Sequence, residues 1–445
     1  MPIFNIPIKE TIYLSWDLNE AHLAGQEVID DYEAFVKQLS LQSQSLRDIN
    51  VNDLLSFFDS LATCWMSSNG SFLRKYSRVG VTFLLNFIRK ANLQRLLNTS
   101  LRGNISYLDN FHEAPELGKK IMAHPRGIVT HWLAGNVPVL GMISLITAML
   151  SKNGNIIKLP RKNGLVLPSM VADFKEHKIQ TADGKVLEGR QLVDSIKFIY
   201  CEKDDLVSQR LLSCNSDVRV AWGGREVIET ILSLPKHYGI EDVIFGPKYS
   251  FALISRNSFN KSELDSIAYR LALDASIFEQ QGCNSPHTVF VEERSEISPL
   301  DFAKALARGM EKVLKTIPKE EVSADEAYSI VNIRSEYSFS GEVFSSKGTE
   351  WTVIYSQEQG LAHPSYSRVL FVRPIKDIYD IIDFVDKHKQ TLGLLIDQTR
   401  KIDFAKAITA KGIERITEFG KMSFFDYPWD GMFPIDRFVR WVSLS

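Results

Sequence analysis

Apolar residues recur at steps of three and four positions through the first hundred residues of the chain. Segment 51–61, VNDLLSFFDSL, is typical, and its spacing predicts an amphipathic helix. From Arg126 the pattern changes, because short β-branched runs begin to alternate with helical segments. This alternation predicts a parallel sheet covered by helices.

Two α/β units are expected from the alternation. In the first, the clearest helix is at 138–150, since proline is well placed at a first helical position. The expected strands of this unit are 128–133, 156–159, 195–200 and 218–222. The second unit, which continues to about residue 416, is expected to hold strands at 250–255 and 288–291 and a helix at 262–278. The first unit has the character of a nucleotide-binding domain.

Composition narrows the class of protein. The chain has 445 residues, 44% of them hydrophobic, which is enough for two or three domains with large cores. Its 52 basic residues nearly cancel its 54 acidic ones, so no net charge favours nucleic acid or an anionic membrane as partner. The longest apolar run, 137–150, is shorter than the roughly 20 residues that span a bilayer.

The N-terminal residues lack the pattern of a signal peptide, and the four cysteines lack the spacing of metal ligands. We therefore expect a cytoplasmic protein with reduced thiols, without a metal and without a membrane span, which acts on a small bound substrate.

Cys283 is the strongest candidate for chemistry. It stands in segment 278–286, FEQQGCNSP, where a predicted helix gives way to a polar loop that contains glycine. A thiol in such a loop can meet a substrate while its backbone stays fixed, and a thiolate is the strongest side-chain nucleophile near neutral pH. Taken alone, this cysteine is compatible with a protease, a transferase or a redox switch.

Three loops that follow predicted strands carry candidate binding residues. Asn136 precedes a helix, so its amide can point into the crevice at the carboxyl ends of the strands, or it can serve only as a helix cap. Lys158 and Arg161 place positive charge where a ribose or phosphate would lie, although a charge run is usually a solvated loop. The turn at Gly223 and Gly224 could face a pyrophosphate, although most such turns are only turns.

Other reactive residues are expected to be structural. Three histidines could carry protons, but the sequence places no partner beside them, which favours a structural role. They are His131, His287 and His363. The remaining cysteines lie in apolar or strand-flanking contexts that are typical of packing residues. They are Cys64, Cys201 and Cys214.

Taken together, these segments resemble the aldehyde dehydrogenase superfamily, and within it the long-chain acyl-CoA reductases, which include the fatty acid reductase subunit of bacterial bioluminescence. The order and approximate spacing agree from about residue 51 onward. The similar blocks are LAGNVP at 133–138, IIK at 156–158, VAWGG at 220–224, FGPK at 245–248 and QQGC at 280–283. The resemblance implies an α/β fold of aldehyde dehydrogenase type, with a Rossmann-type cofactor domain, an α/β catalytic domain and a small oligomerisation element.

The resemblance also implies a domain plan. We expect a helical segment and the dinucleotide-binding domain over residues 1–246, with an oligomerisation hairpin near 103–123. The catalytic domain with the nucleophilic cysteine is expected over 247–425. Residues 426–445 are expected to form a C-terminal tail that contacts another subunit of a homo-oligomer.

Roles carry over from the resemblance residue by residue. Cys283 matches the acyl-accepting nucleophile, and Asn136 matches the side chain that holds the oxyanion together with the backbone N–H of Cys283. Lys158 matches the lysine that contacts the adenosine ribose. The other matches are Gly223 and Gly224 near the pyrophosphate, and Phe245 and Gly246 along the nicotinamide. No residue in 363–368 matches the second carboxylate of the family, which contacts the nicotinamide ribose.

Two departures from the oxidising aldehyde dehydrogenases are informative. Ile244 stands where those enzymes commonly have a glutamate that activates water, so transfer to CoA or reduction by hydride is favoured over hydrolysis. Arg161, followed by Lys162, stands where NAD-preferring relatives often have a glutamate, and a cation favours a 2′-phosphate. We therefore expect NADPH in preference to NADH.

The expected function is the NADPH-dependent reduction of an activated fatty acyl group, as acyl-CoA or acyl-protein thioester, to an aldehyde through an acyl-cysteine. Two alternatives stay open: an aldehyde dehydrogenase that runs in the oxidative direction, acylating CoA or hydrolysing, and a non-catalytic subunit that carries an acyl group or docks a partner. The resemblance also implies an acyl-protein synthetase as partner.

Overall fold

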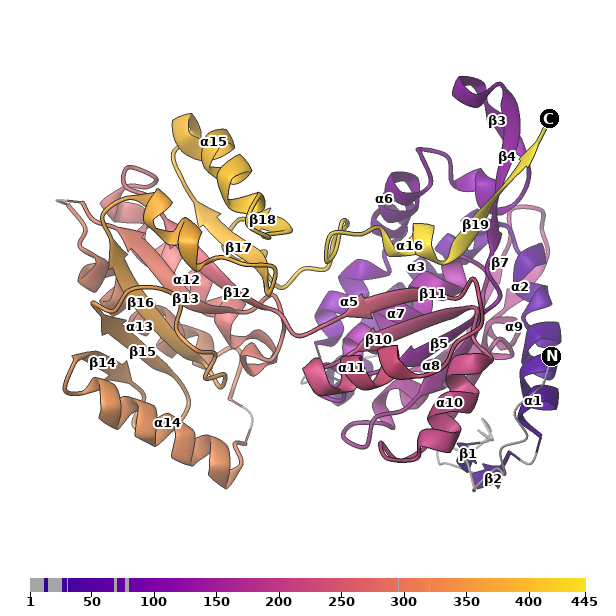
Figure 1. Cartoon of the computed structure of the whole chain (residues 1–445), viewed down its shortest axis with the longest axis horizontal. Helices are drawn as coiled ribbons and strands as arrows, with labels where there is room; N and C mark the ends of the chain where they lie inside the picture. The colour runs from indigo at the N-terminus through magenta and orange to yellow at the C-terminus, as the bar shows by residue number, and fades with distance from the viewer. Residues whose placement is uncertain are drawn as a thin grey trace. The chain divides into compact units, whose positions relative to one another are not determined.

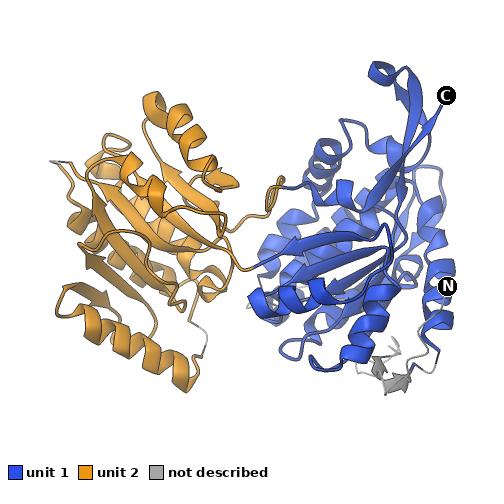
Figure 2. Cartoon of the chain, in the orientation of Figure 1, with its two compact units in different colours: residues 1–246, 432–445 blue, residues 247–431 orange. Residues whose placement is uncertain are grey.

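The computed structural model describes residues 12–14, 26–29, 31–67, 70–76, 80–294, 296–319 and 321–445. The chain forms two compact units (Figure 2). The first unit comprises Met1–Gly246 and Met432–Ser445, and the second comprises Pro247–Gly431. Of the tail expected over 426–445, residues 432–445 belong to the first unit and the preceding six to the second.

The first unit is built on a sheet that has, in the described part of the chain, the strand order β11-β10-β5-β6-β9-β1-β2. Figure 1 shows three of these strands, β11, β10 and β5, side by side. The five strands from β11 to β9 are parallel, and β1 pairs antiparallel with β9 and β2. Every residue of β5 and β10 is buried, as expected where helices cover both faces of a parallel sheet. The strands are β1 (Ile12–Leu14), β2 (Gln26–Val28), β5 (Ile128–Trp132), β6 (Gly154–Lys158), β9 (Ile196–Tyr200), β10 (Val218–Trp222) and β11 (Glu241–Phe245).

Helices cover this sheet. Residues of α1, α10 and α11 share one apolar cluster with strand residues such as Ile156 and Ala221, while α7 packs on β5 and β6 and is buried along almost its whole length. The helices are α1 (Tyr32–Gln42), α2 (Gln44–Asp48), α3 (Val51–Ser67), α4 (Ser71–Tyr76), α5 (Val81–Phe87), α6 (Lys90–Ser100), α7 (Pro138–Leu150), α8 (Val166–Glu176), α9 (Gly189–Val193), α10 (Leu206–Cys214), α11 (Arg225–Ser233) and α16 (Pro434–Arg437).

Two small antiparallel sheets complete the first unit. β7 (Lys178–Gln180) pairs with β8 (Val186–Glu188). β3 (His112–Ala114), β4 (Lys119–Pro125) and β19 (Val439–Leu444) form the other, in the order β19-β4-β3. The C-terminal strand therefore returns to the hairpin that the sequence placed near 103–123.

The second unit has a sheet of its own, in the order β14-β15-β16-β13-β12-β17-β18. All neighbours are parallel except β14 and β15. The strands are β12 (Tyr249–Ile254), β13 (Pro286–Glu292), β14 (Gly341–Ser345), β15 (Thr352–Ser356), β16 (Val369–Ile375), β17 (Lys389–Leu395) and β18 (Arg415–Thr417).

Alternate residues of β12 explain how helices cover both faces of this sheet. Ala252 and Ile254 belong to the core under α12 (Leu264–Ser276) and α13 (Pro299–Leu314), whereas Phe251 and Leu253 belong to the core under α15 (Gln398–Thr409). The remaining helix is α14 (Ala324–Tyr337).

Short 3-10 helices connect these elements. They are η2 (Ile105–Leu108), η3 (Pro115–Leu117), η4 (Lys261–Glu263), η5 (Ile277–Gln280) and η6 (Ile378–Phe384).

Candidate functional site

The candidate binding residues of the first unit lie at one edge of its sheet. β11, β10, β5 and β6 are consecutive neighbours and parallel, so their carboxyl ends meet at this edge. Each of the four strands ends in, or leads into, residues singled out from the sequence. These are Phe245 and Gly246 for β11, Gly223 and Gly224 for β10, Asn136 for β5, and Lys158 and Arg161 for β6.

The strand order reverses at this edge. The chain passes from β5 to its neighbour β6 and on to β9, and it then returns to place β10 on the other side of β5. In open α/β sheets, ligands bind outside the carboxyl ends of strands at such a reversal. The loop of Asn136 and the turn of Gly223 flank the reversal, so the candidate residues gather where sheets of this kind bind ligands.

The loops after β5 and β6 are held together. Asn163 donates from Nδ2 to the carbonyl oxygen of Gly135 at 2.9 Å. A Cβ on Gly135 would lie 2.5 Å from the carbonyl oxygen of Lys162, so only glycine allows this approach. The backbone beside Asn136 is therefore fixed against the segment that follows Lys158.

Positive charge gathers at the end of β6. Arg161 and Lys162 are exposed, Lys158 is half-buried, and within the described ranges none of the three forms an ion pair. Lys158 also lies near Cys201, whose thiol pKa is raised, first by burial. Three cations without carboxylate partners suit a phosphorylated ligand.

The turns after β10 and β11 leave room for a ligand. A Cβ on Gly224 or Gly246 would meet no atom within 4 Å. Gly224 caps α11 without a side chain, so the first N–H groups of that helix receive no side-chain cap. Trp222 stacks on Phe245 with ring centroids 3.7 Å apart, and the buried Nε1 of Trp222 has no hydrogen-bond partner. Glycine turns, open space and unpaired cations together fit a dinucleotide.

Cys283 lies in the second unit, in the loop before β13. Asn136 lies in the first unit, and each unit is described by itself, so the pairing of these two residues stays a prediction. The helix expected to reach residue 278 ends at Ser276, because Phe278, Glu279 and Gln280 adopt left-handed φ values of 54°, 53° and 62°. Non-glycine residues adopt this conformation only where the surrounding structure compels it.

Contacts made by Gln280 and Glu279 hold this backbone conformation. Gln280 is fully buried, donates from Nε2 to the carbonyls of Pro286 and Val369 at 2.9 and 3.0 Å, and accepts from the N–H of Val369 at 2.8 Å. Glu279 forms a two-point ion pair with Arg368, with contacts of 2.6 and 2.9 Å. The backbone entering the Cys283 loop is therefore tied to the start of β16.

The surroundings of Cys283 come from the amino ends of β12 and β17. Its carbonyl oxygen accepts from Ser250 Oγ at 2.7 Å, and Gln390 hydrogen-bonds its side chain. Gln390 also donates to Asp430 at 2.6 Å, and Lys248 lies 3.7 Å from Asp430. One chain of polar contacts thus links a thiol, an amide, a carboxylate and an ammonium.

Burial, aided by the charge of Asp430, raises the pKa of the Cys283 thiol to about 12, although Gln390 and Lys248 oppose the shift. The residue as a whole is partly exposed. A pKa this high disfavours the thiolate in the protein alone, so the thiol needs a neighbouring group to take its proton when it attacks. Burial also raises the pKa of Asp430, which suits this carboxyl to accept that proton.

Sequence reasoning missed Gln390 and Asp430 as members of the site. Both lie more than a hundred positions after Cys283 and carry no local motif. Lys248 stands in the FGPK block, so its position was marked but its contact with Asp430 was not.

The three candidate histidines differ in burial and in hydrogen bonding. His131 is buried between Ser144 Oγ and Asn155 Oδ1, at 2.9 and 3.1 Å, and burial lowers its pKa to about 4, which confirms a structural role. His287 is also buried, but neither ring nitrogen has a hydrogen-bond partner. His363 is exposed.

Among the other cysteines, Cys201 is buried as expected, whereas Cys214 is half-buried and Cys64 is exposed. The expectation of packing is wrong for Cys64, which lies on the solvent side of the amphipathic helix α3.

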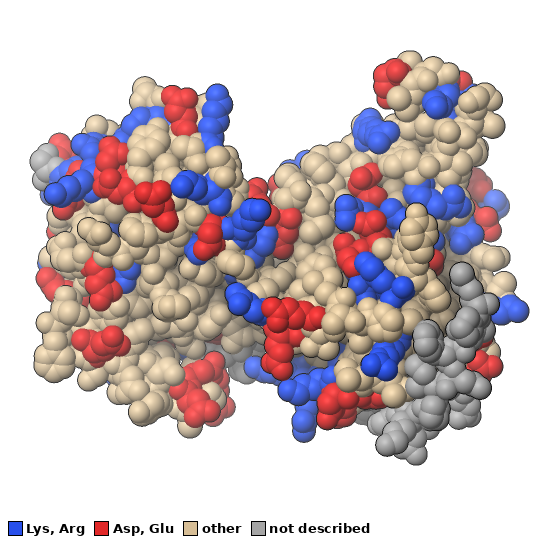
Figure 3. Space-filling view, in the orientation of Figure 1, with Lys and Arg blue, Asp and Glu red and all other residues tan. Residues whose placement is uncertain are grey.

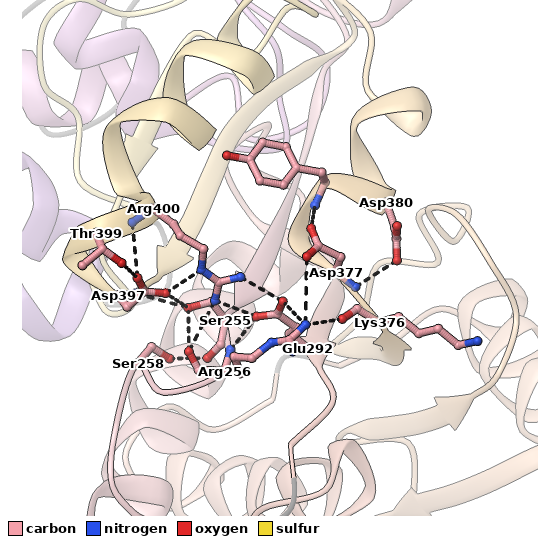
Figure 4. Close-up of polar contacts among 11 residues, drawn as sticks. Ser255, Arg256, Ser258, Glu292, Lys376, Asp377, Asp380, Asp397, Thr399 and Arg400 are labelled. Atoms are coloured by element: carbon pink, nitrogen blue, oxygen red, sulfur yellow. Dashed lines mark hydrogen bonds and ion pairs between the residues drawn. The ribbon is translucent and has the colours of Figure 1, made fainter.

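The opposite edge of the second sheet is closed by ion pairs (Figure 4). Glu292 ends β13 with a fully buried side chain, and Arg400 binds it at two points, 2.8 and 2.9 Å. Arg256, after β12, contacts it through Nη2 at 2.8 Å and through its backbone N–H at 2.7 Å. Asp397, after β17, holds Arg400 Nε at 2.8 Å. These contacts thus join the carboxyl ends of β12, β13 and β17 to one another. The charged groups there pair with each other and not with a ligand.

The charges on one face of the surface are mixed. On the face seen in Figure 3, positive and negative side chains are interspersed over both units. Across the described ranges, no group of three His, Cys, Asp or Glu side chains is placed to hold a metal ion. No helix among these residues is both long and apolar enough to span a bilayer.

Comparison with known proteins gives concordant findings. Residues 46–441 match the family described as acyl-CoA reductase (LuxC). The long-chain acyl-protein thioester reductase of Aliivibrio fischeri is 28% identical over 415 residues, which cover 89% of this chain and 82% of that protein. The enzyme of the same name from Vibrio harveyi is 28% identical over 421 residues, covering 89% and 83%.

Solved structures of aldehyde dehydrogenases share the fold. Aldehyde dehydrogenase 21 from Physcomitrella patens superposes with a TM-score of 0.64 at 12% identity, over 99% of this chain and 95% of that one. The NADP-dependent glyceraldehyde-3-phosphate dehydrogenase from Bacillus halodurans, solved with NADP, gives a TM-score of 0.61 at 12% identity, over 93% and 90%. The expected aldehyde-dehydrogenase-like architecture is confirmed.

Proposed function

The chain belongs to the acyl-CoA reductase (LuxC) family, and on that premise we propose that it reduces a long-chain fatty acyl thioester to an aldehyde with NADPH, through an acyl group carried on Cys283. The observation that carries the proposal is the family match over 46–441, which includes the Cys283 loop and all four strand ends of the first unit. The acyl donor is an acyl-protein thioester or acyl-CoA, and an acyl-protein synthetase is the proposed source of the former.

The proposed reaction begins with transfer of the acyl group. Cys283 Sγ attacks the thioester carbonyl while its proton passes to Asp430, and Gln390 bridges the two side chains. Asn136 and the backbone N–H of Cys283 are proposed to hold the tetrahedral oxyanion. The donor leaves as a thiol that takes the proton, and an acyl thioester remains on Cys283.

Reduction then follows at the same carbon. When bound, the reduced nicotinamide supplies a hydride to the carbonyl carbon. Cys283 next leaves as the thiolate, so that the acyl group departs as an aldehyde, and the thiolate regains a proton that solvent supplies, while Gln390 keeps its hydrogen bonds to Cys283 and Asp430. Lys158, Arg161 and the turns at Gly223 and Gly246 are proposed to hold the NADPH.

Ile244 favours the reductive direction. Its side chain packs against the apolar core of the first unit, so this position offers no base to activate water. An acyl group on Cys283 would then persist until hydride or a thiol removes it.

The direction of the reaction can be tested with two assays on one preparation. NADPH oxidation is followed with a long-chain acyl-CoA or acyl-protein thioester, and NADP⁺ reduction is followed with the aldehyde, with and without CoA. We expect turnover with the thioester and slow oxidation of the aldehyde in water alone. Rapid aldehyde oxidation without CoA would overturn the proposal in favour of a hydrolytic dehydrogenase.

The sheet of β19, β4 and β3 is the proposed oligomer contact. β3 is an edge strand, and unpaired edges are where sheets of two chains join. Sedimentation equilibrium should show a homo-oligomer that a proline in β3 dissociates, whereas a monomer for the unaltered chain would contradict this assignment.

A further inference from the structure

Asp274, on α12, is a fully buried carboxylate that gathers backbone N–H groups from a distant segment. Its Oδ2 accepts from the N–H of Gly420 at 2.5 Å, and its Oδ1 accepts from the N–H of Met422 at 3.1 Å. The N–H of Ser423 also hydrogen-bonds this carboxylate. Gly420 has a left-handed φ of 84°, which turns the segment toward the helix. Asp274 therefore sets the course of segment 420–423.

The same segment holds the loop that carries Cys283. The carbonyl oxygen of Met422 accepts from Asn284 Nδ2 at 2.9 Å and from Arg415 Nη1 at 2.8 Å. Asn284 is buried and follows Cys283 directly in the chain. A continuous path of hydrogen bonds thus runs from Asp274 through Met422 to the residue beside the reactive cysteine.

This arrangement suits the charged form of Asp274 better than the neutral form. Both carboxylate oxygens accept from N–H donors, so a proton on either oxygen would oppose a donor. Burial raises the pKa of Asp274 to about 7, while the backbone hydrogen bonds oppose the shift. The carboxylate therefore changes charge close to neutral pH.

The charges around Asp274 are few. From β18, Arg415 acts on Asp274 and also lies near Asp426 and Cys283. From α12 itself, the stem of Arg270 lies beside Gly420. On α13, Arg308 and Lys312 contact α12 but engage other residues. Arg308 pairs with Asp265, and Lys312 lies over Tyr269.

The contribution of Asp274 to stability depends on pH. Between the ordinary value of 3.8 and about 7, the folded protein keeps a proton that the unfolded chain has released. The contribution of Asp274 to stability therefore falls as pH rises through this window.

We infer that Asp274 is a positioning residue for the acyl transfer: as a carboxylate it fixes segment 420–423, which through Asn284 sets the position of Cys283. The inference rests on the proposed function only in taking Cys283 as the reacting group. Its consequence is that Cys283 loses reactivity below neutral pH beyond what ionisation of its own thiol accounts for.

The test uses alkylation of Cys283 by iodoacetamide in the full-length protein, quantified by peptide mass spectrometry from about pH 5.5 to about pH 9.5. The variants are Asp274→Asn and Asn284→Ala. Asp265→Asn, on the solvent side of the same helix, is the matched control. In parallel, kcat and KM for the acyl thioester are measured for each protein.

For the unaltered protein and Asp265→Asn, we expect the logarithm of the alkylation rate to rise with pH and to carry an added step near pH 7. Asp274→Asn and Asn284→Ala should each lose the step, and kcat should fall about tenfold or more with KM changed less than about threefold. If Asp274→Asn does not fold, the alkylation profile of Asn284→Ala alone tests the inference.

A step that persists in Asn284→Ala would overturn the inference, because Asp274 would then act on the thiol through space. A profile without a step in the unaltered protein would also overturn it. Alkylation needs neither acyl donor nor NADPH, so failure of the proposed reaction and failure of this inference give different results.

Discussion

The ion pairs around Glu292 give a quantitative prediction about the second unit. The substitution Glu292→Gln keeps the shape of the side chain but removes its charge from between Arg256 and Arg400. In the structure this fully buried carboxylate takes four contacts of 2.7–2.9 Å, three from guanidinium groups and one from a backbone N–H. These contacts hold its pKa down to about 2 although burial acts to raise it.

The size of the expected loss in unfolding free energy follows from the burial of Glu292. Breaking a buried ion pair by removing one partner costs about 3–5 kcal/mol. The amide keeps one acceptor, and the guanidinium side chains of Arg256 and Arg400 are 43% and 26% exposed, so water partly compensates them. We therefore expect a loss of about 2–3 kcal/mol in the unfolding free energy of the second unit. That loss corresponds to about 30- to 150-fold faster amide exchange in its central strands.

Hydrogen exchange followed by peptide mass spectrometry measures the amide exchange rates of β12, β13 and β17 separately from those of the first unit. The control is Asp383→Asn, which breaks an exposed pair with Lys411 and should change exchange by less than about threefold. Acidification supplies a second control. The contribution of Glu292 is complete above its ordinary pKa of 4.5 and is lost as pH falls through about 2, so the two proteins should converge in acid. Unchanged exchange at neutral pH would refute the reasoning.

Three further predictions concern candidate residues of the first unit and Cys283 of the second. Arg161→Glu should weaken NADPH binding about 10- to 100-fold while leaving NADH binding nearly unchanged, as measured by titration of cofactor fluorescence, and an equal loss for both cofactors would contradict a phosphate contact. Gly135→Ala should raise the Kd for NADPH at least about tenfold, because its Cβ would meet the backbone oxygen of Lys162 at 2.5 Å, whereas Gly224→Ala meets open space and should change it far less. In the protein without ligands, alkylation of Cys283 should accelerate about tenfold per pH unit between about pH 8 and about pH 10, because the thiol pKa is about 12, and a plateau in this range would contradict the burial of the thiol.

The alternation of strands and helices made much of the fold predictable. The strand at 218–222 and the helix at 138–150 have the expected bounds, because a β-branched run between turn signals and a proline at a first helical position are local features. β13 is longer than expected and runs from Pro286 to Glu292. Proline and glutamate are not strand formers, and only the distant arginines make a buried glutamate tolerable here.

The site was less predictable, for physical reasons. Residues that follow strand ends, such as Asn136 and Arg161, could be placed because parallel strands bring their carboxyl ends together. Left-handed backbone at Phe278 depends on contacts with segment 366–369, which no local pattern reveals. The protonated state of Cys283 likewise depends on burial and on Asp430, which the fold brings from far along the chain.

The central claim is that Cys283 accepts an acyl group, and intact-protein mass spectrometry tests it most directly. The protein is mixed with a long-chain acyl-CoA without NADPH, beside Cys283→Ala and, as a matched cysteine control, Cys64→Ala. The account predicts an added mass equal to one acyl group in the unaltered protein and in Cys64→Ala, none in Cys283→Ala, and loss of the added mass when NADPH is supplied. An unaltered protein that gains no acyl mass, or one that keeps it in the presence of NADPH, would contradict the account.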